Sequence, residues 1–383
     1  MITNAKRLKS VEEYYFSRKL KEVAFLKSQG KPIINLGIGS PDLAPPVKAA
    51  NTLTESLAHE TAHKYQGYQG IPELRQEISN FYKSKYGVSL SSQTEILPLL
   101  GSKEGIMHIS MAFLNKGDKV LVPNPGYPTY AAVTKLLEAK PIYYDLKEEN
   151  NWEPDFTALE RLDLSRVKIM WVSYPHMPTG AKASNKFYDD VIAFGKRHDI
   201  LVVNDNPYSF VLNDKPISIM RYNNAKQVCL ELNSLSKTFN MAGWRVGMLV
   251  GQYDFVSAVL KVKSNMDSGM FYGIQKGAVE ALKCSDMWYV SLNSVYEQRR
   301  DLVWQLASHL NCTYDTDSSG MFVWAKIPEG QKSEDFTDKL LKTHSIFIAP
   351  GTVFGSNGEG YVRFSLCAPE ALIKEAIERV TSS

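Results

Sequence analysis

Between about Thr94 and Cys229 the sequence alternates short apolar runs with stretches of helical spacing, and this alternation constrains the fold most. The run VKIMWV, for example, is followed by the helix-like KFYDDVIAFGKRHD, which leads into the next run, ILVVN. Apolar strands that alternate with helices predict a mostly parallel central β-sheet covered by helices on both faces. In such sheets the functional groups lie at the carboxyl ends of the strands. We therefore predict an α/β fold and look for chemistry where each strand ends.

The pattern changes after about residue 270. A long helical stretch, IQKGAVEALKCSDMWYVSLNSVYEQRRDLVWQLAS, is followed by the short strands GMFVWAKI and GYVRFSL and by a terminal helix, PEALIKEAIERV. The N-terminal residues also look helical and end at Gly30, a residue type that often ends helices. At 383 residues the chain is long enough for two domains of about 150 residues or more. We expect a large domain over residues 45–270 and a smaller α+β domain formed by residues 1–44 together with 271–383.

Composition excludes several classes of protein. The chain has 44 Lys and Arg against 41 Asp and Glu, a net charge of +3 with no basic block, so charge gives no reason to expect nucleic acid or an anionic membrane as partner. Apolar runs stay well below the roughly 18 residues of a membrane span, and residues 1–27 lack the apolar stretch of a secretory signal. The four cysteines form no CxxC pair, which indicates free thiols in the cytoplasm rather than disulfides or a metal site. They are Cys229, Cys284, Cys312 and Cys367.

Two strand ends carry groups that suit a flat, phosphorylated ligand. In LPLLGSKEG a strand, a glycine turn at Gly101 and a helix start coincide, so the free N–H groups and the helix dipole at Ser102 and Lys103 would suit a phosphate. In NPGYPTY, Tyr127 lies between prolines, where its ring could stack on a flat ligand. Taken alone, the first segment is more simply explained as a connecting turn, and Tyr127 as an aromatic residue packed in a loop.

The strand in VVNDNPYSF ends in a carboxylate, Asp205, with the phenol of Tyr208 three residues later. A buried aspartate is costly unless it meets a positive partner, and a protonated ring nitrogen would be such a partner. An aspartate at this place could also simply cap a turn.

The segment LNSLSKTFNMAGWRVG places Lys237 just past a strand, with Ser234 and Ser236 beside it and Arg245 eight residues later. A lysine held in a partly apolar pocket has a lowered pKa, which frees its amine to form a Schiff base. Two hydroxyls and an arginine nearby would bind a phosphate. A phosphate site, a stacking ring, a carboxylate and a nucleophilic lysine are together what pyridoxal 5′-phosphate requires.

With these motifs the chain resembles the fold type I pyridoxal-phosphate aminotransferases of class I/II over essentially its whole length. The resemblance is closest to the branch of bacterial aspartate, alanine and LL-diaminopimelate aminotransferases, and SLSKTFNMAGWRVG is its most specific segment. It implies that Lys237 binds the cofactor covalently and that Ser234 and Arg245 hold its phosphate. It further implies that Asp205 pairs with the pyridine nitrogen and that Tyr208 hydrogen-bonds the ring's phenolic oxygen. GSKEG then corresponds to the phosphate loop and Tyr127 to the stacking aromatic.

Three further positions follow from the same resemblance. Tyr65 in KYQGYQGIPELR matches a tyrosine that reaches the phosphate of the neighbouring subunit, which implies a homodimer with an active site shared between subunits. Arg363 in YVRFSL matches the arginine that binds the substrate's α-carboxylate, for which a planar guanidinium is well suited. Gly39 in LGIGSPD matches a glycine whose backbone lies close to that carboxylate.

One segment departs from the family pattern. The family usually has Asn-Pro-Thr-Gly after the third strand, where the Asn donates a hydrogen bond to the ring oxygen, whereas this chain has Met177 before Pro178-Thr179-Gly180. A methionine cannot donate. Either Tyr208 serves the ring oxygen alone, or His176 or another polar group replaces the missing donor.

The sequence therefore predicts a homodimeric cytoplasmic aminotransferase of amino acid metabolism, which moves an amino group between an L-amino acid and a 2-oxo acid. A carbon–sulfur β-lyase on the same scaffold is the alternative, because it would use the same lysine and aspartate. A cofactor-dependent regulator would need a DNA-binding segment, for which residues 1–40 are too short. The amino donor stays open: the stretch KVKSNMDSGMFYG offers Lys261 and Lys263 to a second carboxylate but no arginine.

Overall fold

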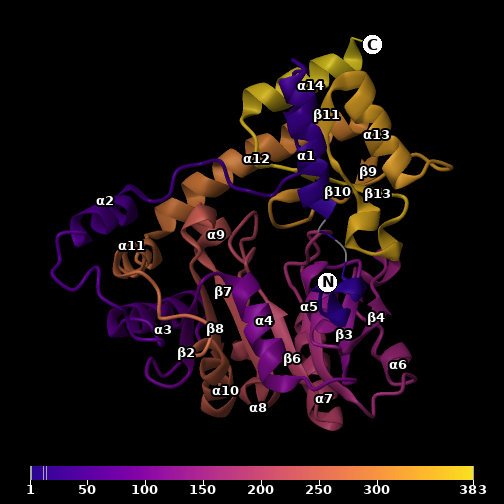
Figure 1. Cartoon of the computed structure of the whole chain (residues 1–383). Helices are drawn as coiled ribbons and strands as arrows, with labels where there is room; N and C mark the ends of the chain where they lie inside the picture. The colour runs from indigo at the N-terminus through magenta and orange to yellow at the C-terminus, as the bar shows by residue number, and fades with distance from the viewer. Residues whose placement is uncertain (1, 12, 14, 383) are drawn as a thin grey trace.

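In the computed structural model, which describes residues 2–11, 13 and 15–382, the predicted alternation forms a central seven-stranded sheet with the strand order β2-β8-β7-β6-β5-β3-β4 (Figure 1). Strand β8 pairs antiparallel with both of its neighbours, and the pairs among β7, β6, β5, β3 and β4 are parallel. The predicted mostly parallel sheet and α/β class are confirmed. The strands are β2 (Ile96–Leu99), β3 (Lys119–Asn124), β4 (Lys140–Asp145), β5 (Val167–Val172), β6 (Leu201–Asp205), β7 (Cys229–Ser234) and β8 (Gly247–Gly251).

Helices cover both faces of this sheet because successive strand residues point to opposite sides. In β5, Ile169 and Trp171 belong to one apolar cluster, while Met170 and Val172 belong to the other. The first cluster is completed by α4 (Ser102–Phe113), α5 (Thr129–Leu136) and α10 (Tyr253–Lys263). The second is completed mainly by α3 (Pro72–Tyr86), α7 (Asn185–His198) and α11 (Tyr272–Leu282). Short helices α6 (Phe156–Leu159), α8 (Ala225–Val228) and α9 (Leu235–Thr238) lie in the connections.

A second, four-stranded antiparallel sheet, β12-β13-β10-β9, lies beyond the carboxyl ends of the central strands (Figure 1). Long helices pack around it, and β1 (Ile34–Asn35) pairs in parallel with β11 (Ile346–Phe347) nearby. The elements are β9 (Thr313–Tyr314), β10 (Phe322–Lys326), β12 (Ala349–Pro350), β13 (Tyr361–Ser365), α12 (Asp286–His309), α13 (Ser333–His344) and α14 (Glu370–Thr381).

The predicted long helical stretch after residue 270 is two helices, because α11 ends at Leu282 and α12 starts at Asp286. Ser285 adopts an extended backbone at the start of α12, and Asp286 places a carboxylate in its first turn, where the helix dipole favours negative charge. Helix α11 packs against α3 and against α2 (Val47–Ser56). The division into 45–270 and 1–44 with 271–383 therefore stays a prediction, since α11 contacts helices of the large part.

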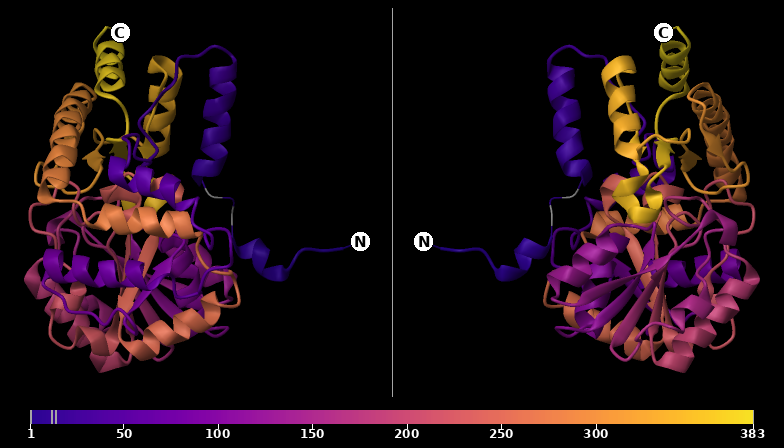
Figure 2. Two further views of the ribbon diagram at one scale, coloured as in Figure 1. Left: turned by 90° about the vertical axis from the view of Figure 1, so that its left-hand side faces the viewer. Right: turned by 90° about the vertical axis from the view of Figure 1, so that its right-hand side faces the viewer.

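The described N-terminal residues form two separate elements. A short 3-10 helix, Lys6–Ser10, lies against α5, and residues 2–5 before it project to one side, whereas α1 (Tyr15–Ser28) stands beside the second sheet (Figure 2). The chain after α1 turns at Gly30, whose φ of 81° is a left-handed conformation that glycine adopts without strain. All four cysteines are free thiols. Within the described part of the chain, no helix combines the length and apolar character needed to cross a membrane.

Candidate active site

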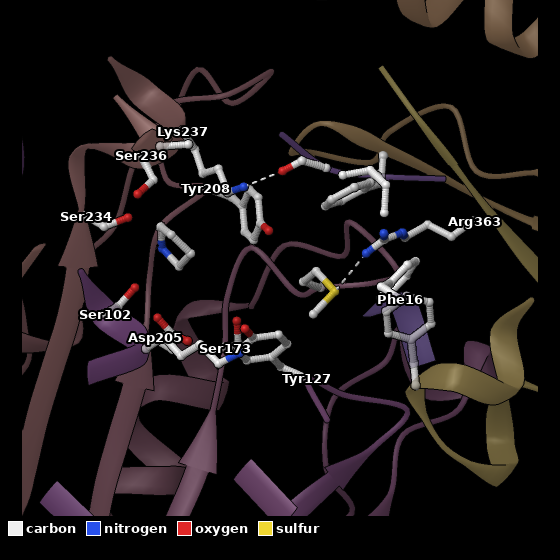
Figure 3. Close-up of a pocket in the computed structure, with 18 of the residues that line it drawn as sticks. Phe16, Ser102, Tyr127, Ser173, Asp205, Tyr208, Ser234, Ser236, Lys237 and Arg363 are labelled. Carbon is white, nitrogen blue, oxygen red and sulfur yellow. Dashed lines mark hydrogen bonds between the residues drawn. The ribbon is translucent and has the colours of Figure 1, made fainter. Parts of the chain in front are cut away.

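A cavity of about 1000 Å³ lies between the carboxyl ends of the central strands and the second sheet (Figure 3). Strands β2, β3, β5, β6 and β7 all end at its wall, so residues far apart in the sequence meet there. Eleven of the residues singled out from the sequence line this cavity: Gly39, Ser102, Lys103, Tyr127, Asp205, Tyr208, Ser234, Ser236, Lys237, Arg245 and Arg363. Gly101 lies directly beside it, against Arg245.

Lys237 is placed by α9, the single helical turn that follows β7. Its Nζ donates to the backbone oxygen of Gly39 and lies 6.0 Å from the ring centre of Tyr208. Burial lowers the pKa of Lys237 to about 8, and the nearby cations Arg363 and Arg245 act in the same direction. At pH 7 about one such amine in ten is neutral, far more than for an ordinary lysine, and the neutral form is the one that a nucleophile or a general base needs.

Asp205 ends β6 and is 5% exposed. Its Oδ2 accepts a hydrogen bond of 2.8 Å from the phenol of Tyr130, whereas its Oδ1 has no hydrogen-bond partner among the described residues. Burial raises the pKa of Asp205 to about 6, and the charge of Glu231 adds to this, while the Tyr130 hydrogen bond opposes it. A buried carboxylate with one unpartnered oxygen needs a cationic or N–H partner from a ligand.

Hydroxyl, ammonium and guanidinium donors gather at one end of the cavity. Ser102 and Lys103 begin α4, and Ser234 and Ser236 flank the turn from β7 into α9. Arg245 follows the short 3-10 helix Ala242–Trp244 and adopts a left-handed backbone at φ 58°.

Gly101 allows the close approach of these groups, since a Cβ there would lie 2.2 Å from Nη2 of Arg245 at a φ of +91°. Helix N-terminal N–H groups together with serine hydroxyls and an arginine form a donor set typical of phosphate binding.

Arg363, on the opposite side of the cavity, comes from β13 and is 5% exposed. Its guanidinium carbon lies 3.8, 4.6 and 5.4 Å from the ring centres of Phe322, Phe354 and Phe16, respectively. Cation–π contact with three rings orients the guanidinium. Its Nη2 donates to the Gly37 oxygen at 2.9 Å. The geometry suits a site for a carboxylate.

The positions of Met177 and His176 bear on which group could serve the ring oxygen in place of the family's asparagine. Met177 lines the cavity, and its sulfur accepts a 3.4 Å hydrogen bond from Nη1 of Arg363. His176 is not among the cavity-lining residues; its Nδ1 lies 2.8 Å from the Thr179 hydroxyl, and burial lowers its pKa to about 3. His176 is therefore neutral and turned into the protein, so it does not supply the donor that Met177 lacks. Tyr208, whose phenol pKa is raised by burial, lines the cavity instead.

Tyr65, by contrast, does not line the cavity, and its side chain is 91% exposed. Conversely, sequence reasoning missed several residues that line it. In the sequence, a spacing of about one helical turn after Tyr127 weakly indicates that Tyr130 lines the cavity. The sequence contains no such indication for α1 or for the aromatic residues around Arg363, since their positions depend on packing. The missed residues are Phe16, Lys21, Tyr130, Ser173, Phe322 and Phe354.

Away from the cavity, Glu104, His108 and Asp267 bring three potential ligand atoms within 4.8 Å of one another. The fully buried Lys263 forms an ion pair with Asp267 and lies 3.9 Å from Glu104, so a cation already neutralises this group. Lys263 is therefore not available to a second substrate carboxylate.

The chain resembles known proteins along nearly all of its length. Residues 31–380 match the model of the family described as aminotransferase class I and II. An LL-diaminopimelate aminotransferase of Halothermothrix orenii is 38% identical over 382 residues, which cover 99% of this chain and 98% of the relative. A protein of the same name from Oleidesulfovibrio alaskensis is 38% identical, with 99% of both chains covered.

Solved structures agree with the sequence relatives. The apo structure of BacF from Bacillus subtilis superposes with a TM-score of 0.96 at 35% identity, covering 100% of this chain and 98% of that one. A structure of an aminotransferase from Staphylococcus aureus gives 0.90 at 31% identity, with 99% and 98% covered.

Proposed function

Since this chain belongs to the aminotransferase class I and II family and is a transaminase that moves an amino group between an amino acid and a 2-oxo acid, we propose that its large cavity performs the transfer on bound pyridoxal 5′-phosphate. The unpartnered Oδ1 of buried Asp205 is the observation that carries the proposal, because it requires a ring N–H or a cation from a ligand. The rest of the wall fits the same cofactor: a phosphate-type donor set, an aromatic ring at Tyr127 and a lysine of lowered pKa.

In this assignment Ser102, Ser234, Ser236 and Arg245 hold the phosphate, and the side chain of Lys103 and the turn at Gly101 complete that end. Tyr127 stacks on the pyridine ring, while Asp205 pairs with its nitrogen. Tyr208 donates to the ring oxygen, since its raised pKa keeps the phenol protonated. When bound, the cofactor supplies an electron sink that makes the substrate's Cα–H acidic.

The protein's own groups then bind the substrate and move the proton. Arg363 and the backbone at Gly39 hold the α-carboxylate, which orients Cα toward Lys237. The Nζ of Lys237, neutral in part near pH 7, would accept the Cα proton as a general base and then, as a general acid, donate it to the C4′ carbon of the bound cofactor. Met177 leaves one Arg363 donor on a weak sulfur acceptor, so that donor is easily turned to the incoming carboxylate.

A homodimer forms part of the proposal. Tyr65 is almost fully exposed and does not line its own cavity, as expected of a residue that serves a neighbouring subunit. The N-terminal segment exposes Ile2 and Leu8, apolar residues that a partner chain would cover. Free cysteines support a cytoplasmic location. Because curated relatives carry the name LL-diaminopimelate aminotransferase, that amino acid with 2-oxoglutarate is the first pair to test.

Borohydride reduction of the cofactor-loaded protein, followed by peptide mass spectrometry, tests the assignment. We expect the label at Lys237 and none at Lys103 or Lys21, the other lysines of the cavity. A label at either of those would show that the cofactor binds differently. Measurement of ammonia and pyruvate without any 2-oxo acid acceptor checks for the β-lyase reaction.

A further inference from the structure

Tyr130, which sequence reasoning missed, makes the hydrogen bond to the carboxylate at the centre of the proposed site. Its phenol donates to Asp205 Oδ2 at 2.8 Å, and both residues line the cavity. Tyr130 is 1% exposed and Asp205 is 5% exposed, so water does not compete for this contact. A hydrogen bond to a buried charge is among the stronger contacts in a protein interior.

The Tyr130 ring is itself fixed in place. It stacks on Trp171 with ring centres 4.9 Å apart and planes 5° from parallel. It also meets Tyr127 in a T-shaped contact, with ring centres 5.6 Å apart and planes at 87°. Trp171 belongs to β5, which pairs with β6, the strand that carries Asp205. The indole on which Tyr130 stacks and the carboxylate that it contacts therefore lie on neighbouring strands of one sheet. Tyr130 thus contacts both the acid and the aromatic ring assigned to the cofactor.

We propose that Tyr130 is a positioning residue for transamination, which holds Asp205 by Oδ2 so that Oδ1 is presented to the cavity. This inference rests on the proposed function, in which Asp205 pairs with the ring nitrogen of the cofactor. An aspartate with two unpartnered oxygens could rotate about its side-chain bonds. The bond to a stacked phenol removes that freedom, and the carboxylate is aligned before the cofactor arrives.

The same bond favours the charged form of Asp205. Burial and Glu231 both favour the protonated acid, and Tyr130 opposes them by donating to the anion. Without the phenol, the carboxyl group would stay protonated to higher pH, so a smaller fraction of it would be anionic near neutrality. The titratable groups that act on Asp205 come from α5, β7, the end of β3 and its own loop: Tyr130, Glu231, Tyr127 and Tyr208. The cations Lys237, Arg245 and Arg363 line the same cavity.

The test compares two buried tyrosines that both contact Trp171. Tyr130→Phe removes the bond to Asp205, whereas Tyr144→Phe removes a 2.7 Å bond to the Trp171 backbone oxygen and leaves Asp205 untouched. Infrared titration of the cofactor-free proteins, with the spectrum of Asp205→Asn subtracted, reports the protonation state of the Asp205 carboxyl group directly. We expect Tyr130→Phe to raise the titration midpoint by about one to two pH units. Tyr144→Phe should leave it at the wild-type value.

The second readout is pyridoxal 5′-phosphate affinity, measured by equilibrium dialysis near neutral pH. Tyr130→Phe should bind about tenfold more weakly than wild type. Tyr130→His, which keeps a ring N–H donor and a flat ring, should recover part of the loss. Unchanged titration and affinity in Tyr130→Phe, with only the stability loss seen in Tyr144→Phe, would overturn the inference. A wild type that binds no cofactor would instead overturn the proposed function, while the carboxyl titration would still report on the Tyr130–Asp205 bond.

Discussion

Arg363 donates through Nη1 to the sulfur of Met177, 3.4 Å away. The family pattern implies a different neighbour for this position, the ring oxygen of the cofactor, with which the family's asparagine is associated. In this chain the side chain at that place instead touches the guanidinium assigned to the substrate carboxylate. Met177 is therefore expected to affect substrate binding.

Met177→Asn tests that expectation. An amide oxygen is a stronger acceptor than a thioether sulfur, so it should hold Nη1 of Arg363 against the incoming carboxylate. A hydrogen bond of about 0.5–1.5 kcal/mol corresponds to a KM for the amino acid raised roughly two- to tenfold. Met177→Leu, of similar volume and without an acceptor, should stay near wild type. A changed cofactor absorbance band with an unchanged KM would show that the introduced asparagine serves the cofactor after all.

Arg363→Ala should chiefly raise the KM for the amino donor. Truncation of one partner of a buried charge pair costs about 2–5 kcal/mol, or about 30-fold to several thousand-fold in affinity. Arg363→Lys keeps the charge but loses the planar fork, so its KM should fall between those of wild type and Arg363→Ala. The measurement is initial-rate kinetics with the amino donor varied. An unchanged KM in Arg363→Ala would mean that the carboxylate binds elsewhere.

Asp205 should make the cofactor-free protein less stable as the pH rises. Its folded pKa of about 6 lies above the usual 3.8, so between about pH 4 and pH 6 the unfolded chain loses this proton first and the native state loses stability. An asparagine at this position does not titrate. The free energy of unfolding of Asp205→Asn, relative to wild type, should therefore rise by on the order of 3 kcal/mol between pH 4 and pH 7.5.

Urea denaturation of both proteins at the two pH values measures this difference. Addition of pyridoxal 5′-phosphate at pH 7.5 should reverse the order, because the cofactor stabilises the form with Asp205 more strongly. A difference that is the same at both pH values would show that burial does not raise this pKa.

The proposed homodimer with a shared active site predicts that two inactive variants complement each other. Lys237→Ala lacks the nucleophile, and Tyr65→Ala lacks the residue that is assigned to the neighbour's phosphate. In a mixed dimer one cavity receives Lys237 from one subunit and Tyr65 from the other, so refolded mixtures should regain up to about a quarter of wild-type activity. Each variant mixed with itself is the control. Mixtures that stay inactive would place Tyr65 in the site of its own subunit, and full activity of Tyr65→Ala by itself would place Tyr65 outside the site.

The central sheet and one wall of the site follow from the order of residues along the chain. Strand and helix periods are local properties, and parallel strands bring their carboxyl ends to one edge, so Asp205, Ser234 and Lys237 had to meet once the alternation was recognised. That these residues line one cavity could be predicted from the sequence for that reason.

Other contacts exist only because the chain is folded, since no local pattern encodes them. Phe16, near the N-terminus, contacts the guanidinium of Arg363, near the C-terminus, and Met177 contacts the same guanidinium. Tyr130 stacks on Trp171 and donates a hydrogen bond to Asp205. Each depends on how side chains from separate elements pack in a dense interior, where shape and distance select the partners. The hydrophobic period of a segment indicates which face of its helix or strand a residue occupies. Only the packed fold shows which side chains that residue contacts.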